Sequence, residues 1–132
     1  MVVDTSALVA VLRNEPDGTA LMDRLAQHPA PVMSAVSWME SRMVILSRSG
    51  ESGVSALRDL IATARIQVVP VSPEQANVAF EAFRRFGKGR HSAGLNFGDC
   101  FAYALSRELN APLLFKGDDF TKTDLVAALG TS

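Results

Sequence analysis

This sequence contains very few cysteine and histidine residues, on which disulfide bonds and zinc sites depend. Its 132 residues include one cysteine, Cys100, and two histidines, His28 and His91. A single cysteine excludes an internal disulfide. Because the histidines show no repeated spacing, the chain also lacks the Cys/His pattern typical of a zinc site. We therefore expect a protein of the reducing cytoplasm.

An excess of charge of either sign is also lacking. Thirteen Lys and Arg residues stand against fourteen Asp and Glu residues, which gives a formal net charge of −1. No global basic field therefore indicates nucleic-acid binding. Any affinity for phosphate has to come from a local basic patch.

Long apolar runs and a targeting segment are missing as well. The opening segment, MVVDTSALVAVL, has no basic region, contains Asp4 early and is too short to span a bilayer. We expect no membrane association.

The overall composition is that of an ordinary globular protein. With 132 residues, 48% hydrophobic and 20% charged, the chain is long enough to bury a core. It contains no internal repeat, linker or low-complexity segment. We therefore expect residues 1–132 to form a single domain.

Short apolar runs alternate with amphipathic segments along the chain. The apolar and β-branched runs predict strands over residues 2–3, 31–33, 66–69 and 113–115. Helical spacing predicts helices that follow Asp4 and Asp17, and further helices over residues 36–47, 54–64, 74–86, 96–109 and 122–129. Residues 47–53 read as a turn and residues 87–94 as a mobile loop. This order predicts an α/β fold, a short parallel sheet of four or five strands flanked by helices on both faces.

Four acidic residues lie where a predicted strand gives way to a helix, or within the first turns of that helix. They are Asp4, Glu40, Asp99 and Asp118. Parallel α/β folds bring such positions to one edge of the sheet. Carboxylates gathered in a partly dry cleft raise one another's pKa unless a cation neutralises them. The pattern therefore predicts a metal site.

Glu40 gives the strongest single indication of such a site. Helical spacing places it on the same face as four apolar residues, where a solvated carboxylate is out of place: Val36, Met39, Met43 and Val44. The alternatives are a helix rotated so that Glu40 lies at the edge, or a pairing with a basic residue such as Arg42.

Each of the other acids also has a purely structural explanation. Asp4 can cap the helix that follows it. Asn96 can cap the helix predicted over residues 96–109. Asp99 lies three residues further on, where a carboxylate interacts favourably with the helix dipole. Asp118 and its neighbour Asp119 can cap the final turn. Four separate structural roles would require four unrelated coincidences at one edge of the sheet, whereas one shared metal site explains all four acids.

Oxygen ligands alone select a hard cation, Mg²⁺ or Mn²⁺. A water activated by such a metal can attack phosphorus while the cation steadies the charge on the phosphate oxygens. These are the parts that hydrolysis of a nucleic-acid backbone requires.

A local basic segment is available to attract phosphate. Residues 83–91 hold four of the thirteen Lys and Arg residues, with no acid between Glu81 and Asp99. We expect Arg85 and Lys88, together with Lys116, to contact the nucleic-acid backbone. The alternative is a solvated helix end whose arginines complement the helix dipole.

Three sequence segments carry a resemblance to a known family: VVDTSA at the start, LNFGDCFAYALS around Asp99, and LLFKGDDF near the end. With Glu40 between them, the chain resembles a PIN-domain ribonuclease, particularly the VapC-type toxins of type II toxin–antitoxin systems. The resemblance covers nearly the whole chain. It implies a short parallel sheet between helices, and Mg²⁺- or Mn²⁺-dependent cleavage of RNA.

Carried over by position, the resemblance makes Asp4 and Asp99 the principal metal ligands and Glu40 the second acid. Asp118 or Asp119 becomes the fourth acid. Three polar residues match positions that steady the ligands or the scissile phosphate, namely Thr5 or Ser6, and Asn96. The resemblance also implies a homodimer and a small VapB-type antitoxin whose C-terminal segment blocks the cleft.

Two rival interpretations remain. An aspartyl-phosphate phosphatase would need a second Asp two residues after Asp4, where this chain has Ser6, and a signalling receiver would need a phosphorylatable Asp in place of Val69-Pro70. A non-catalytic PIN-like module would use the same acidic cleft only to dock a basic peptide.

Overall fold

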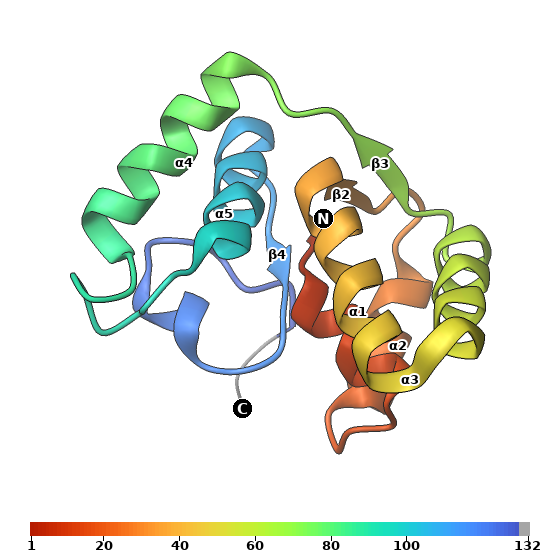
Figure 1. Cartoon of the computed structure of the whole chain (residues 1–132). Coiled ribbons are helices and arrows are strands. Elements are labelled where there is room, and N and C mark those ends of the chain that lie inside the picture. Colours follow the sequence, from red (N-terminus) through yellow and green to blue (C-terminus); the bar gives the residue numbers. More distant parts are fainter. Residues whose placement is uncertain (130–132) are drawn as a thin grey trace.

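The computed structural model describes residues 1–129 and alternates very short strands with helices (Figure 1). The strands are β1 (Val2–Val3), β2 (Val32–Ser34), β3 (Gln67–Val69) and β4 (Leu113–Leu114). The helices are α1 (Thr5–Leu12), α2 (Gly18–Gln27), α3 (Ala35–Thr63), α4 (Pro73–Phe86) and α5 (Phe97–Leu109), followed by a 3₁₀ helix, η1 (Asp119–Lys122).

The four strands form one parallel sheet in the order β3-β2-β1-β4. Val2 of β1 pairs with Val32 on one side and with Leu113 on the other. Parallel strands point their carboxyl ends to the same edge, so the residues after β1, β2 and β4 meet there. The predicted α/β class and parallel sheet are confirmed.

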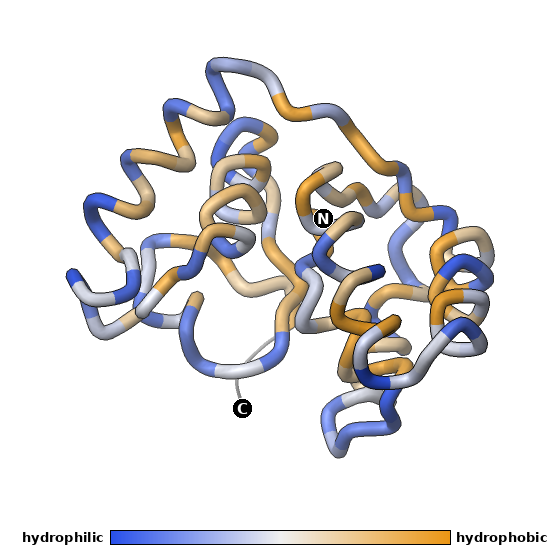
Figure 2. The backbone as a smooth tube through the Cα atoms, in the orientation of Figure 1, coloured by the Kyte–Doolittle hydropathy of each residue, from blue (hydrophilic) through white to orange (hydrophobic). Residues whose placement is uncertain are grey.

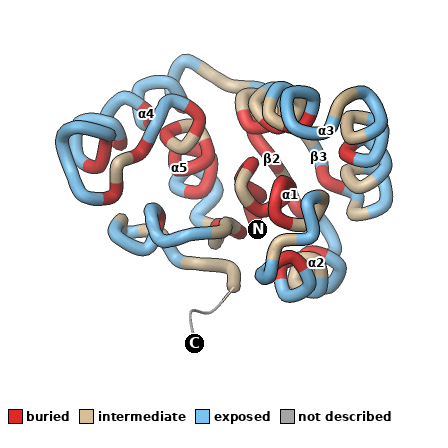
Figure 3. Tube along the Cα trace, turned by 60° about the horizontal axis from the view of Figure 1, so that its bottom comes forward, coloured by how far each residue is buried: buried red, intermediate tan, exposed pale blue. Residues whose placement is uncertain are grey.

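Helices cover both faces of this sheet. Successive strand residues point to opposite sides, so both faces carry apolar side chains that the helices bury. Val3 packs into a core with α1, α2 and α3, whereas its neighbour Val2 packs into a second core with α4 and α5. Strands β1 and β4 are hydrophobic where they run between the two layers (Figure 2), and burial is concentrated on β1, β2 and β4 and on the inner faces of the helices (Figure 3).

Helix α3 contains a sharp break where the sequence predicted a turn over residues 47–53. Within α3 only Gly50 leaves the helical region, with φ 68° and ψ −165°, and the helices on its two sides meet there at a kink. A positive φ with an extended ψ is accessible almost only to glycine. The predicted turn is thus a one-residue kink that divides α3 into two arms.

The predicted last helix, over residues 122–129, is wrong. After η1 the chain runs extended beside β4, where Leu113 N–H donates to Val126 and Ala128 N–H donates to Leu113. So short a helix is marginal by its own propensity, and the sheet edge satisfies these backbone groups instead. The fifth strand that we considered appears only as one isolated bridge between Leu113 and Ala127.

The loop over residues 87–94 is tied at its base. Lys88 N–H donates to Leu95 at 2.9 Å, and Leu95 N–H donates to Phe86 at 2.9 Å. Ala93 within the loop is fully buried. Among residues 1–129, no helix is both long enough and apolar enough to cross a membrane.

Candidate metal centre

Three of the predicted acids line one open pocket at the carboxyl edge of the sheet. The pocket has a volume of about 290 Å³, and its walls come from α1, α3, α5 and the ends of β1 and β4. Its lining residues are Asp4, Thr5, Ser6, Val9, Glu15, Glu40, Val44, Arg48, Asn96, Asp99 and Lys116. We call this the acid pocket.

Asp4 caps α1 with only half of its carboxylate. Its Oδ2 accepts hydrogen bonds from the Ser6 amide at 3.0 Å and from the Ser6 hydroxyl at 2.6 Å. Its Oδ1 is buried and finds no hydrogen-bond donor among residues 1–129. Burial raises the pKa of Asp4 to about 6, and the charge of Glu40 adds to this shift. A buried carboxylate oxygen without a donor is a position that a cation would satisfy.

Asp99 likewise combines a structural role with membership of the acidic cluster. It forms a capping box in which its amide donates to Asn96 Oδ1 at 2.9 Å and its Oδ2 accepts from the Asn96 amide at 3.0 Å. Burial raises the pKa of Asp99 to about 7, and the charges of Asp4, Glu40 and Asp119 act in the same direction. Asp99 therefore lies within electrostatic range of each of these three carboxylates.

Glu40 lines the acid pocket, but not for the reason that the sequence suggested. The apolar face expected from its spacing is wrong, because Met39 and Met43 are 51% and 57% exposed. The buried stripe of this arm consists instead of Ser37, Ser41 and Ile45. Glu40 lies at the flank of that stripe and faces the pocket, as in the rotated-helix alternative.

The pairing of Glu40 with Arg42 is absent from the ion pairs among residues 1–129. The Arg42 guanidinium instead lies over the Trp38 ring, 3.7 Å from its centroid.

Gly98 is a site residue that the sequence reasoning missed. A Cβ atom built on Gly98 would overlap the carboxylate of Glu40. Only glycine therefore lets the first turn of α5 approach Glu40 this closely. The available signal was the glycine directly before Asp99 in NFGDC, a helix position where glycine is otherwise unfavourable.

The two aspartates considered for the fourth acid are both exposed and lie outside the lining of the acid pocket. Asp119 is close enough to Asp99 to raise its pKa, and Asp118 does not contribute to that shift. Of these two aspartates, Asp119 is thus the one whose charge acts on Asp99.

The basic residues divide between the acid pocket and other surfaces. Lys116 lines the pocket, where its side chain pairs with Glu15 and its amide donates to Ser6 Oγ at 3.0 Å. Ser6 thereby links the end of β4 to Asp4. Arg48, which the sequence reasoning did not name, is the second cation of the lining.

The two basic residues expected from the segment over residues 83–91 lie outside the pocket lining. Arg85 forms an ion pair with Asp124 at 3.6 Å, and Lys88 is exposed in the loop after α4. The contact of Arg85 with the C-terminal segment joins residues far apart in the sequence, which local charge patterning cannot predict. Lys116 is thus the predicted basic residue that the fold brings to the acids.

Cys100 is a core residue that packs in the cluster formed with α4 and α5. It is 4% exposed, and burial, with the charge of Asp99, raises the pKa of its thiol to about 11. A thiol with so high a pKa is not a nucleophile at neutral pH.

The donor set of the acid pocket fits a hard divalent cation. All candidate ligands are oxygens, and among the described residues the buried Oδ1 of Asp4 has no hydrogen-bond donor, so a cation could bind it. Within residues 1–129, no three His, Cys, Asp or Glu side chains are already as close as the ligands of one ion. A hard divalent cation bound here would therefore complete its coordination with water.

Comparison with known sequences gives a consistent family. The model of the PIN domain family matches residues 1–126. "Ribonuclease VapC" of Mycolicibacterium smegmatis is 50% identical over 127 residues, covering 96% of this chain and 98% of that protein. "Ribonuclease VapC30" of Mycobacterium tuberculosis is 46% identical over 125 residues, covering 95% of each.

Solved structures share the fold at low sequence identity. VapC20 of Mycobacterium tuberculosis, described as a sarcin–ricin loop cleaving toxin, superimposes with a TM-score of 0.77 at 18% identity, over 95% of both chains. VapBC2 of Rickettsia felis, bound to a DNA fragment from its promoter, gives a TM-score of 0.73 at 16% identity, over 96% of this chain and 95% of that one.

Proposed function

The chain belongs to the PIN-domain ribonucleases of the VapC type, the toxins of toxin–antitoxin systems, and on that premise we propose that Asp4, Glu40 and Asp99 together bind Mg²⁺ or Mn²⁺ for the endonucleolytic hydrolysis of RNA. The observation that carries this proposal is the buried Oδ1 of Asp4. It lacks a donor among the described residues, in a pocket that it shares with the other two acids.

The surrounding residues fix the ligands rather than bind the ion. Ser6 holds Oδ2 of Asp4 through two hydrogen bonds and so leaves Oδ1 available to the cation. Asn96 holds Oδ2 of Asp99 in the same manner. Such outer contacts keep carboxylates in place when the reacting phosphate arrives.

A bound divalent cation would supply two things: a water of lowered pKa as nucleophile, and positive charge for the phosphate oxygens. The chain's own contribution is to hold that cation beside two cations of its own, Arg48 and Lys116. We assign these two residues to the RNA backbone. We place Arg85 outside the substrate path, because its partner is Asp124.

We also make two proposals about the partners of this chain. We propose that an antitoxin of the VapB type blocks the acid pocket, and that two copies of the chain associate. Exposed aromatic and methionine side chains support the second point, since large exposed apolar patches mark interaction surfaces. They lie on α3, α4 and the start of α5: Met39, Met43, Phe80, Phe83 and Phe97.

RNA cleavage by the purified chain tests the proposed reaction. With Mg²⁺ or Mn²⁺ we expect cutting that a chelator abolishes, and for Asp99→Asn a loss of at least about 100-fold, since even outer contacts of metal sites are worth 10–100-fold. Asp23→Asn, an exposed acid on α2, is the matched control and should cut like the wild type. Undiminished cutting by Asp99→Asn would contradict the proposal.

Calorimetry with Mn²⁺ separates the nuclease from a docking module that has the same fold. The nuclease must bind the ion, with weaker binding in Asp4→Asn and Asp99→Asn. A module that only docks a basic peptide needs no ion, so absence of Mn²⁺ binding together with absence of cleavage would favour that rival.

A further inference from the structure

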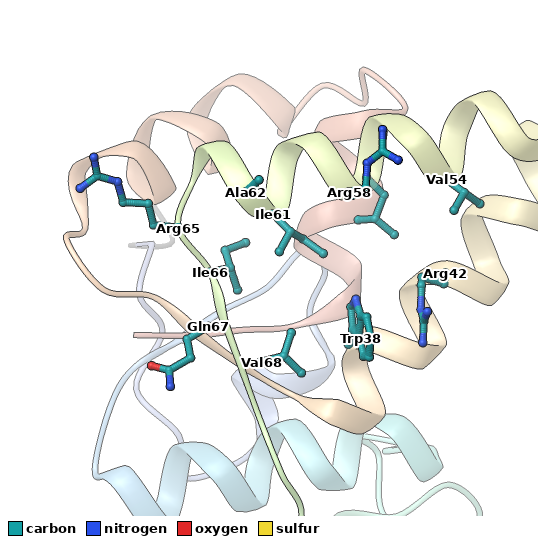
Figure 4. A pocket seen from close by; sticks show the side chains of 11 residues that line it. Trp38, Arg42, Val54, Arg58, Ile61, Ala62, Arg65, Ile66, Gln67 and Val68 are labelled. Atoms are coloured by element: carbon teal, nitrogen blue, oxygen red, sulfur yellow. The ribbon is translucent and has the colours of Figure 1, made fainter.

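A second cavity of the described residues has a larger volume than the acid pocket. A groove of about 660 Å³ lies between the two arms of α3 and the edge strand β3 (Figure 4). In Figure 4, Trp38 and Arg42 lie on the first arm, Arg58 and Ile61 on the second, and Val68 on the strand between them. We call this the α3 groove.

The floor of the α3 groove is aliphatic. Leu57 and Ile66 are buried beneath it, while Ile61 and Val68 are half-buried along its walls. Trp38, the only tryptophan of the chain, closes one end. Branched aliphatic walls of this kind match the side chains of another protein segment.

Three arginines surround this apolar floor. Arg42, Arg58 and Arg65 all line the groove, and none of its lining residues within the described chain is acidic. Nε of Arg42 is buried without a hydrogen-bond partner among residues 1–129, and Arg58 pairs only with its exposed neighbour Asp59. A positive groove on a chain of net charge −1 is a local feature that favours carboxylates.

The α3 groove faces away from the acid pocket. Trp38 and Arg42 are four residues apart and share one side of the first arm, whereas Glu40 lies two residues from each and so points to the opposite side. RNA held at the acids would therefore not pass through this groove. The guanidinium of Arg42 covers one face of the Trp38 ring, so no base can stack on that face.

The edge strand offers backbone groups as well. Gln67 N–H donates to Pro31 at the start of β2, and alternate residues of a strand point their N–H groups in opposite directions. The N–H of Val68 is thereby directed to the open side of β3, next to the groove. An extended segment can pair with such an edge.

We propose that the α3 groove binds a short extended segment of a partner protein that carries leucine-like side chains for the aliphatic floor and carboxylates for Arg42 and Arg58. This site is separate from the acid pocket, so the inference stands or falls independently of the proposed nuclease function.

Trp38 provides a built-in reporter for the test. The full chain is titrated with a 12-residue peptide in which pairs of leucine and glutamate alternate, and with its counterpart in which lysine replaces glutamate. We expect a saturable change in Trp38 emission with the glutamate peptide, and binding at least about tenfold weaker with the lysine peptide. Higher salt should weaken the glutamate complex.

A variant with reversed charges in the groove distinguishes a loss of the specific contacts from a loss of folding. The double variant Arg42→Glu, Arg58→Glu should reverse the preference and bind the lysine peptide more tightly, which an unfolded protein would not do. Arg84→Glu, on the distant helix α4, should keep the wild-type preference. Equal responses to both peptides, no saturable response, or displacement of the peptide by a 12-nucleotide RNA would each overturn the proposal.

Discussion

Asp4 and Asp99 each serve a helix and the acid pocket at the same time. In both residues one carboxylate oxygen accepts the hydrogen bonds of a helix start, through Ser6 for Asp4 and through Asn96 for Asp99. Capping and metal binding appeared as alternatives in the sequence because a residue type and its spacing do not distinguish the two oxygens. In the structure the oxygen that caps the helix is Oδ2 in both residues, which leaves Oδ1 for the metal binding that we propose.

Gly98→Ala should weaken metal binding without destabilising the fold. The added Cβ displaces the carboxylate of Glu40, while alanine is the better helix former by about 0.5–1 kcal/mol. We expect lower Mn²⁺ affinity by calorimetry, slower RNA cleavage, and an unchanged or higher free energy of unfolding.

A second change should reverse the effect of the first. Glu40→Asp withdraws the carboxylate by one methylene, so the double variant Gly98→Ala, Glu40→Asp should regain part of the Mn²⁺ affinity lost in Gly98→Ala. Wild-type Mn²⁺ affinity in Gly98→Ala alone would show that the contact does not position Glu40.

Asp4 should make the metal-free protein less stable as pH rises. Burial raises the pKa of Asp4 to about 6 in the folded chain, above its ordinary value of 3.8. The folded chain favours the neutral form of Asp4. The contribution of this neutral carboxyl group to the free energy of unfolding is therefore fully present below pH 4 and is lost as pH rises through about 6. The loss is on the order of 3 kcal/mol.

The measurement is urea unfolding in a chelator at pH 4.5 and pH 7.5. Relative to the wild type, Asp4→Asn should gain stability at the higher pH, and added Mg²⁺ should stabilise the wild type but not the variant. Asp23→Asn is the control for removal of an exposed carboxylate. A stability difference between wild type and Asp4→Asn that does not change with pH would contradict this prediction.

At the scale of whole elements, the strands and most helices could be predicted from the sequence, whereas the orientation of α3 could not. Apolar spacing suggested a buried face with Met39 and Met43, yet the fold buries Ser37 and Ser41, small residues that allow close packing of α3 against α1. Thr5 of α1 donates to the Ser37 carbonyl at 3.1 Å in this contact. The best hydrophobic face of a helix need not be the face that the neighbouring helix covers.

The kink in α3 should depend on glycine at position 50. No atom lies within 4 Å of a Cβ built on Gly50, so the cost of Gly50→Ala comes from its backbone angles alone. We expect the free energy of unfolding to fall by about 1–3 kcal/mol in urea. Ser55→Ala, an exposed position on the second arm, is the control and should change stability little. A stable Gly50→Ala variant would mean that the two arms can straighten.

Across the whole molecule, apolar residues remain exposed around α4 and the start of α5. Phe80 and Phe97 are 54% and 74% exposed, and Phe80, Phe83 and Phe97 surround a hollow of about 380 Å³. This surface supports the proposed homodimer, because exposed aromatic side chains are enriched at such interfaces.

Phe80→Glu should disrupt the proposed homodimer. Light scattering of the wild type should give twice the 14.2 kDa mass of the chain, and the variant should approach the mass of one chain because a carboxylate would be buried in the interface. Leu109→Glu changes an equally exposed residue at the far end of α5 and should leave the mass unchanged. A wild type that scatters as a single chain would refute the proposed dimer.

The sequence by itself determined the order of the four strands and the succession of helical segments up to β4, the parallel α/β class and the family. These depend on local periodicity, on strand ends marked by carboxylates, and on contiguous motifs such as NFGDC. Only the tertiary structure decided which partners meet across the chain: Glu40 with Gly98, Lys116 with Glu15, and Arg85 with Asp124. The physical reason is that local patterns record which residues prefer burial or charge, whereas packing between distant elements selects the face and the partner.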